Sequence, residues 1–193
     1  MVNEQATSQK YISADVEKIL LSEDEIKSKV VELGQQISKD FQNSVSSQEP
    51  LIVIGILKGV IVFLADLMRE IDLPLELHFI DIESQSAGTR ETGLQELDSR
   101  IQRAIQGKHV LFVEDIIDAG LSCSYMTRLL WQYAPASISV CTLLSKESNR
   151  MMDIDIRYVG FNIQPLYVVG YGLDNNELYR NLPFIGLLSE HAR

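Results

Sequence analysis

Three carboxylates that could act together, Glu114, Asp115 and Asp118, follow directly on the apolar run Val110–Val113. The run predicts a buried strand, because a short and wholly apolar segment is typical of a strand covered on both faces. Small and hydroxyl residues from 119 to 122 then lead into an apolar-periodic segment that predicts a helix. Because ligands of open α/β sheets bind at the carboxyl ends of strands, the segment predicts a ligand site.

The chemistry of this segment fits a sugar phosphate. Carboxylates only accept hydrogen bonds, so Glu114 and Asp115 suit the vicinal hydroxyl groups of a ribose. Backbone N–H groups at a turn and at a helix N-terminus bind anions, so the turn suits the phosphate. The residues expected to hold the phosphate are Ala119, Gly120, Leu121 and Ser122. Asp118 remains to face the group that reacts.

Alternating strands and helices must position these residues. Ser22 and Glu25 form a capping box, and apolar residues at helical spacing continue from there as far as Phe41. Further apolar segments predict strands at Leu51–Ile56, Leu75–Ile82, His109–Val113 and Ser137–Leu144, and helices at Val60–Arg69 and Ser122–Tyr133. Strands that alternate with helices predict an α/β fold with a central parallel sheet flanked by helices.

The end of the chain and one long loop depart from this alternation. Short β segments at Ile156–Phe161, Tyr167–Val169 and Phe184–Leu188 predict a small antiparallel cap over the ligand crevice. The segment Ser84–Asp98 is polar and has no periodicity, which predicts a long mobile loop. Loops of this length in compact domains are usually functional, so we expect this one to close over the site.

Length, charge and cysteine content narrow the class of protein. A chain of 193 residues favours a single domain with a proper core. Its 17 basic and 27 acidic residues give a net charge of −10, whereas binding of nucleic acid needs a basic face. Two cysteines make no disulfide framework, the first ten residues are too polar for a secretory signal, and no apolar run approaches membrane-spanning length. The composition therefore predicts a cytoplasmic protein that binds neither nucleic acid nor membranes.

The segment around the three carboxylates resembles the ribose-phosphate signature of type I phosphoribosyltransferases. Four other segments, Gly55–Gly59, Tyr158–Phe161, Val168–Asp174 and Tyr179–Pro183, resemble the bacterial hypoxanthine (hypoxanthine-guanine) phosphoribosyltransferases. The resemblance runs in order from about residue 15 to about residue 188, and four ordered motifs are highly specific. It implies a core parallel sheet with a small hood, in one domain over residues 1–193 whose first 14 residues form a flexible tail.

The resemblance implies a purine salvage enzyme. Its members use Mg²⁺ to transfer the phosphoribosyl group from phosphoribosyl pyrophosphate to N9 of hypoxanthine or guanine, giving IMP or GMP and pyrophosphate. It also implies a homodimer or homotetramer. Two alternatives stay open from the residues: a xanthine-guanine phosphoribosyltransferase, and a regulator that keeps the ligand-binding fold without turnover.

The resemblance also assigns roles to single residues. Asp118 matches the general acid/base beside the purine N7 and belongs to the ribose-phosphate group. The residues matched to pyrophosphate binding are Lys58, Gly59, Ser84, Arg150 and Arg180. Those matched to the purine are Lys146 at the 6-oxo group, Tyr167 stacked on the ring, the carbonyl of Val168 at the base edge, and Asp174. The expected metal ligands are Asp174, Glu114 and Asp115.

Three positions depart from the family pattern. The loop that usually carries a Ser-Tyr pair reads Ser84-Gln85, which predicts less complete closure. Ala119 replaces a hydroxyl residue of the phosphate turn, which predicts a weaker grip on the phosphate. Gln164-Pro165-Leu166 stands before the stacking aromatic in place of the usual Pro-Asp, so the base pocket could also accept xanthine.

Overall fold

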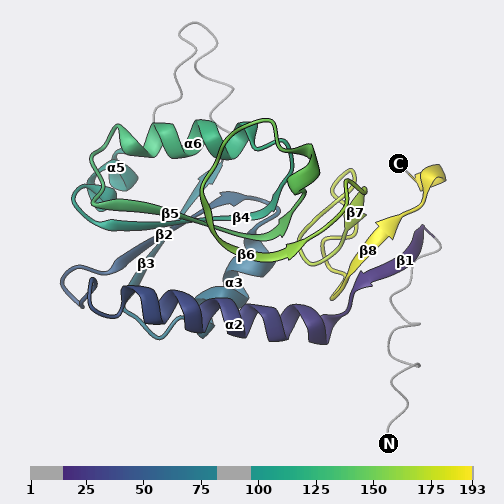
Figure 1. Ribbon diagram of the computed structural model, residues 1–193, viewed down its shortest axis with the longest axis horizontal. Helices are drawn as coiled ribbons and strands as arrows, with labels where there is room; N and C mark the ends of the chain where they lie inside the picture. Colours follow the sequence, from purple (N-terminus) through teal and green to yellow (C-terminus); the bar gives the residue numbers. More distant parts are fainter. Residues whose placement is uncertain (1–14, 82–96, 193) are drawn as a thin grey trace, which may run out of the picture.

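A five-stranded parallel sheet forms the centre of the computed structural model, which describes residues 15–81 and 97–192 (Figure 1). Its strands are β2 (Leu51–Leu57), β3 (Leu75–Asp81), β4 (His109–Ile117), β5 (Ser137–Ser145) and β6 (Ile156–Asn162). They lie in the order β3-β2-β4-β5-β6. The predicted α/β fold is therefore confirmed.

Helices cover both faces of this sheet, and each face has its own hydrophobic core. In Figure 1, α2 (Glu23–Phe41) and α3 (Ile61–Glu70) lie on one face, while α5 (Ser99–Ile105) and α6 (Leu121–Trp131) lie on the other. Because side chains alternate along a strand, Leu111 and Val113 of β4 join the core under α2 and α3, whereas Val110 and Phe112 join the core under α6. Further along β4, the same alternation places the adjacent side chains of Glu114 and Asp115 on opposite faces of the sheet.

The capping box predicted for α2 is present in full. The Ser22 backbone N–H donates to Glu25 Oε2 at 2.8 Å, and the Glu25 backbone N–H donates to Ser22 Oγ at 3.3 Å. The apolar stripe of this helix is buried, from Ile26 to Phe41. The helix therefore starts where its sequence predicts and packs through the predicted face.

A second, smaller sheet forms the hood. Its strands β1 (Val16–Leu21), β8 (Ile185–Leu188) and β7 (Val168–Val169) are antiparallel and lie in that order at one end of the core sheet (Figure 1). The sequence analysis did not foresee β1, which pairs Val16 with Leu188 and so joins both ends of the described chain. The antiparallel cap itself is confirmed.

One predicted cap segment belongs elsewhere. Ile156–Asn162 pairs in parallel with β5 and forms the edge of the core sheet, so grouping it with the antiparallel cap was wrong. Because β6 is only partly buried, its sequence lacks the continuous apolar run that marks a central parallel strand. The short 3₁₀ helices Glu147–Asn149 and Glu190–Ala192 complete the described elements.

Two expectations fall mainly outside the described residues. These are the N-terminal tail at 1–14 and most of the predicted loop at 84–98, which includes Ser84 and Gln85. The described end of that loop caps α5, because the Arg100 backbone N–H donates to Asp98 Oδ1 at 2.7 Å. Cys123 and Cys141 are both buried and free. Within residues 15–81 and 97–192, no helix has the length and apolarity needed to cross a bilayer.

Candidate active site

Three neighbouring strands of the core sheet end beside one another. After β2 comes Lys58, after β4 comes Asp118, and after β5 comes Lys146. The chain runs from β2 outward to β3 and then returns to place β4 on the other side of β2. Such a reversal leaves a crevice at the carboxyl ends of the strands, which is where open α/β sheets bind ligands.

The sequence analysis expected Glu114 and Asp115 to follow the strand, but in the structure both residues belong to it. Strand β4 continues to Ile117, so the pleat of the strand sends Glu114 and Asp115 to opposite faces. Glu114 is only 8% exposed and lies on the α6 face, where its charge acts on Cys123. Asp115 lies on the α3 face, directly against Gly59.

Burial controls the charge of this pair. Desolvation, helped by the charge of Asp115, raises the pKa of Glu114 to about 8. Desolvation also raises the pKa of Asp115 to about 6, although hydrogen bonds from backbone N–H groups, including that of Ile116 at 2.8 Å, act in the opposite direction. Both carboxylates therefore hold protons more readily than exposed ones and would gain from a nearby cation.

The first part of the site, the hood-side group, consists of Lys58, Gly59, Asp115, Asp174, Glu177 and Arg180. Lys58 Nζ lies 3.1 Å from Glu177 Oε1, which links the β2 loop to the hood. Arg180 Nη1 lies 3.0 Å from Asp174 Oδ1, and Arg180 Nη2 lies 3.3 Å from Glu177 Oε2. Hydrogen bonds from Lys58 and Arg180 hold the pKa of Glu177 below its usual range. Two cations and three carboxylates thus face one another across the core and the hood.

The glycine of this group is required for steric reasons. A Cβ atom on Gly59 would lie 1.8 Å from Asp115 Oδ2, well inside the closest approach of real atoms. The peptide bond that precedes the neighbouring lysine, between Leu57 and Lys58, is cis. The loop after β2 therefore brings its backbone directly against the carboxylate of Asp115.

The second part, the turn-side group, consists of Asp118, Ser145, Lys146, Asn149, Arg150 and the turn at residues 119–122. Lys146 Nζ donates to Asp118 Oδ2 at 2.8 Å, and Asn149 Nδ2 donates to Asp118 Oδ1 at 2.9 Å. Although desolvation raises the pKa of Asp118, these two hydrogen bonds and the positive charges of Lys146 and Arg150 together more than offset it, so the pKa lies below its usual value. Asp118 is thus ionised and held by donors.

The turn after Asp118 opens α6 as predicted. Gly120 is the N-cap and has a φ of +82°, a left-handed conformation that favours glycine. The first backbone N–H groups of a helix have no acceptor within the helix, so they point into the space before it. That space is a cavity of about 330 Å³, lined by Glu114 and by residues 116–123. An anion in this cavity would face the N–H groups and the positive end of the helix dipole.

Arg150, which the family resemblance matches to pyrophosphate binding, lies against the turn at residues 119–122. Its Nη2 donates to Ser145 Oγ at 2.8 Å, and its Nε is buried without a hydrogen-bond partner. A Cβ atom on Gly120 would lie 3.0 Å from its Cδ, so the arginine packs under the phosphate turn. The 3₁₀ helix after Lys146 folds Arg150 back to this position. The placement does not support a direct role at pyrophosphate beside Lys58 and Arg180.

Two of the four residues matched to the purine, Tyr167 and Val168, lie at the start of hood strand β7. Tyr167 is 42% exposed, and its hydroxyl group donates to Asn175 Oδ1 at 3.0 Å. Val168 is buried and starts β7, where it pairs with Leu187 of β8. An exposed aromatic ring next to a rigid strand can stack on a planar ligand.

Sequence reasoning missed Glu177, Asn149 and the unusual backbone of the hood loop. Glu177 and Asn149 contact predicted site residues, and each lies within three positions of one, which was the available signal. The backbone gave no such signal, because Tyr171, Asn176, Glu177 and Tyr179 adopt positive φ angles without being glycine. Such conformations concentrate at functional sites, where the surroundings hold them in place. The loop carrying Asp174 and Arg180 is therefore a strained segment.

A resident metal would need help from a ligand. Among the described residues, no three His, Cys, Asp or Glu side chains come together as a complete metal site. Mg²⁺ usually takes one or two carboxylates and fills its other positions with water and substrate oxygens. Asp115 and Asp174 fit this pattern, because their charges interact across the hood-side group. Glu114 faces the opposite side of the sheet, which does not support its predicted role beside Asp115 as a metal ligand.

Comparison with known proteins agrees with this arrangement. The sequence profile of the phosphoribosyl transferase domain matches residues 18–176. The hypoxanthine-guanine phosphoribosyltransferase of Bacillus subtilis strain 168 is 42% identical over 174 residues, which cover 90% of this chain and 94% of that protein.

Two solved structures of hypoxanthine phosphoribosyltransferase from Trypanosoma cruzi extend the comparison, each with a TM-score of 0.83 and 34% identity. One, in complex with the product IMP, matches over 93% of this chain and 94% of that one. The other concerns the role of the C-terminal region in oligomeric state and enzymatic activity, and it matches over 93% and 95%.

The chain belongs to the phosphoribosyltransferase family. Within that family, its relatives place it with the hypoxanthine-guanine phosphoribosyltransferases, which confirms the resemblance inferred from the motifs.

Proposed function

We propose that this protein transfers the phosphoribosyl group of phosphoribosyl pyrophosphate to N9 of hypoxanthine or guanine. The products are IMP or GMP and pyrophosphate. The observation that carries the proposal is the pair formed by Lys146 and Asp118, 2.8 Å apart at the ends of neighbouring strands and beside the anion-binding turn. The family and the names of the relatives support the same reaction.

The Lys146–Asp118 pair is complementary to one edge of a 6-oxopurine. On that edge the oxo group accepts hydrogen bonds, and the neighbouring N7 can carry a proton. The ammonium group of Lys146 only donates and the carboxylate of Asp118 only accepts, so the pair matches O6 and N7–H in that order. Adenine presents an amino group in place of the oxo group, and Lys146 would then face a donor with a donor. The pair therefore selects hypoxanthine or guanine over adenine.

The same pair can move the proton that the reaction releases. As N9 attacks C1′ of the ribose, the bond between C1′ and the pyrophosphate oxygen breaks, and the proton on N7 passes to Asp118. In the ligand-free protein, hydrogen bonds from Lys146 and Asn149 help to hold the pKa of Asp118 low. When Lys146 turns to the purine oxygen, Asp118 loses one donor and becomes a better base.

The hood-side group is suited to the pyrophosphate end of the substrate. Lys58 and Arg180 supply positive charge for a leaving group that gains negative charge in the transition state. Asp115 and Asp174 would hold Mg²⁺ together with oxygens of phosphoribosyl pyrophosphate. Bound there, the metal would neutralise charge on the departing pyrophosphate.

A steady-state assay tests the proposal. Purified protein is supplied with phosphoribosyl pyrophosphate, Mg²⁺ and one of four bases: hypoxanthine, guanine, xanthine or adenine. We expect turnover of hypoxanthine and guanine but not of adenine, because sites built around a hydrogen bond reject the wrong group strongly. Turnover of xanthine and guanine without hypoxanthine would favour the xanthine-guanine alternative. No turnover of any base would favour the regulator that keeps the fold without catalysis.

We also propose that the chain folds as one domain, works in the cytoplasm and assembles as a homodimer or homotetramer. The study of the Trypanosoma cruzi relative links the C-terminal region of that protein to its oligomeric state and enzymatic activity, which motivates a measurement of the oligomeric state of this chain. Light scattering coupled to size-exclusion chromatography measures the assembled mass, and a mass of one chain would contradict the proposal.

A further inference from the structure

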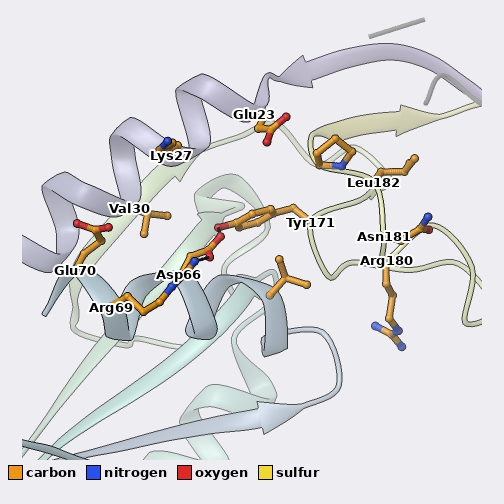
Figure 2. Close-up of a pocket in the computed structure, with 12 residues that line it drawn as sticks. Glu23, Lys27, Val30, Asp66, Arg69, Glu70, Tyr171, Arg180, Asn181 and Leu182 are labelled. Carbon is orange, nitrogen blue, oxygen red and sulfur yellow. Dashed lines mark hydrogen bonds and ion pairs between the residues drawn. The ribbon is translucent and has the colours of Figure 1, made fainter. Parts of the chain in front are cut away.

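One hydrogen bond ties the hood to the core beside a gap between them. Tyr171 of the hood reaches across to α3, where its hydroxyl group donates to Asp66 Oδ2 at 2.6 Å (Figure 2). The two residues are 105 positions apart, and Tyr171 is only 7% exposed. Burial, and then the hydrogen bond to Asp66, raise the pKa of Tyr171, so the phenol keeps its proton and remains a donor.

The space around this hydrogen bond is not solidly packed. A cavity of about 390 Å³ lies between α2, α3 and residues 180–183 of the hood, and both Tyr171 and Asp66 line it. Figure 2 shows the side chains that surround it, drawn from all three elements. Because close packing is missing here, the position of the hood relative to α3 depends more on the polar contact between Tyr171 and Asp66.

The residues next to Tyr171 lead directly into the hood-side group. Gly172 has a φ of +100°, and a Cβ atom on it would lie 2.2 Å from the carbonyl oxygen of Gly59. The Gly172 carbonyl accepts a hydrogen bond from Arg180 Nη1 at 2.8 Å, and its N–H donates to the Arg180 carbonyl at 2.9 Å. Tyr171 is therefore one residue away from the point where the hood touches both the β2 loop and Arg180.

The other end of the contact is equally close to that loop. Helix α3 begins at Ile61, two residues after Gly59, and Asp66 lies on its second turn. Asp66 is also paired with Arg69 on the same helix, which holds its carboxylate in place. A hydrogen bond from Tyr171 to Asp66 thus joins α3, the helix that follows the β2 loop, to the hood loop that carries Arg180.

We propose that Tyr171 and Asp66 are positioning residues for pyrophosphate. They hold Arg180 and Asp174 of the hood in register with Lys58 and Gly59 of the core, without touching the substrate themselves. The inference rests on the proposed function and deepens it, because it assigns the geometry of the pyrophosphate subsite to a contact outside that subsite.

The chain supplies a matched control for this contact. Tyr158 on β6 is 1% exposed, and its hydroxyl group donates to Asp40 Oδ2 of α2 at 2.9 Å. Asp40 also accepts from Arg157, just as Asp66 pairs with Arg69. Both contacts therefore join a tyrosine to an aspartate that holds an arginine, but Tyr158 and Asp40 belong to neither part of the site.

The test is the reverse reaction, in which pyrophosphate and IMP give phosphoribosyl pyrophosphate and hypoxanthine. We expect Tyr171→Phe to raise the KM for pyrophosphate about tenfold, the scale of one hydrogen bond to a charged acceptor. The KM for IMP should stay within about twofold of its original value, because the turn-side group is untouched. Tyr158→Phe should lower the melting temperature by about as much as Tyr171→Phe does, but it should leave the KM values for pyrophosphate and IMP unchanged.

Variants of Asp66 test the same contact from α3. Asp66→Asn keeps an oxygen that can accept from Tyr171 and should retain a KM for pyrophosphate near that of the unmodified protein. Asp66→Leu keeps no acceptor and should match Tyr171→Phe, and this pair also serves if Tyr171→Phe does not fold. Equal KM values for pyrophosphate in Tyr171→Phe, Tyr158→Phe and the unmodified protein would overturn the inference. If the unmodified protein shows no reaction in either direction, it is the proposed function that fails.

Discussion

The turn-side and hood-side groups are assembled in different ways. The turn-side group takes its main residues, Asp118 and Lys146, from the ends of adjacent parallel strands, where the ladder of β4 and β5 holds them. The hood-side group joins the loop after β2 to a segment more than 110 residues away, through side-chain contacts and one close backbone approach. A sheet sets the spacing of the first group, whereas the second depends on how the hood sits on the core.

This difference suggests a division of labour. Groups on rigid strands can hold the geometry that proton transfer needs, because small displacements are costly for catalysis. A group shared between core and hood can adjust when substrate and metal bind, since its contacts are partly exposed ion pairs that contribute little energy each. We therefore expect substitutions in the two groups to change different kinetic constants.

The largest effect should come from Asp118. We expect Asp118→Asn to lower kcat by about 10²-fold or more, because the variant loses the group that accepts the N7 proton. Binding of IMP should persist, since an amide can still hydrogen-bond at this position. Single-turnover kinetics and calorimetric titration of IMP measure the two quantities. A kcat close to that of the unmodified protein would remove Asp118 from the proton-transfer step.

Substitution of Lys146 should affect binding of the purine base more than binding of pyrophosphate. We expect Lys146→Met to weaken binding of hypoxanthine by about 10- to 100-fold, the usual loss for one hydrogen bond from a charged donor. It should also narrow the gap between hypoxanthine and adenine, because the donor that rejects the amino group is gone. Competition assays with both bases measure this ratio. An unchanged ratio would show that selection of the base lies elsewhere.

Lys58 should show the reverse pattern with a smaller effect. We expect Lys58→Met to raise the KM for phosphoribosyl pyrophosphate several-fold and to leave that for hypoxanthine unchanged, because its partly exposed charge is screened by water. The matched variant is Glu177→Gln, which removes the carboxylate that holds Lys58 at 3.1 Å. Glu177→Gln should not raise the KM for phosphoribosyl pyrophosphate in the same way. If Lys58→Met raised the KM for phosphoribosyl pyrophosphate and for hypoxanthine equally, the turn-side and hood-side groups would not act separately.

The last prediction concerns the stability of the ligand-free protein and its dependence on pH. Folding raises the pKa of Glu114 from its ordinary value near 4.5 to about 8, so the folded protein binds more protons than the unfolded chain in this range. Stability of the ligand-free protein should therefore fall as the pH rises from about 5 to about 8, by at most about 1.4 kcal/mol per pH unit for this group.

Urea unfolding at several pH values measures this slope. Glu114→Gln cannot titrate and should flatten the slope, leaving the part due to Asp115, whose pKa is raised to about 6. A slope that is identical in the variant and the unmodified protein would show that folding does not raise the pKa of Glu114.

Much of the architecture could be predicted because it depends on local patterns. The capping box and apolar stripe of α2, the apolar runs of β2 and β4, and the glycine turn before α6 are each readable from a few neighbouring residues. Their alternation predicted the parallel sheet, and the sheet placed Lys58, Asp118 and Lys146 at one edge. Where function depended on these strand ends, the sequence analysis chose residues that the structure brings together.

The rest depended on contacts between distant segments, which no local pattern encodes. The length of β4 decided that Glu114 and Asp115 face opposite sides of the sheet, because the register with β5 carries the strand on to Ile117. The fold of the 3₁₀ helix placed Arg150 against the phosphate turn and Ser145.

The sequence alone thus determined the class of fold, the family and the residues at the strand ends, since each follows from periodicity or from an ordered motif. Tertiary structure alone decided which side each carboxylate faces, that β1 completes the hood, and that Tyr171 reaches Asp66 across 105 residues. The physical reason is that strand register, hood closure and side-chain contacts between distant segments come from packing the whole chain at once.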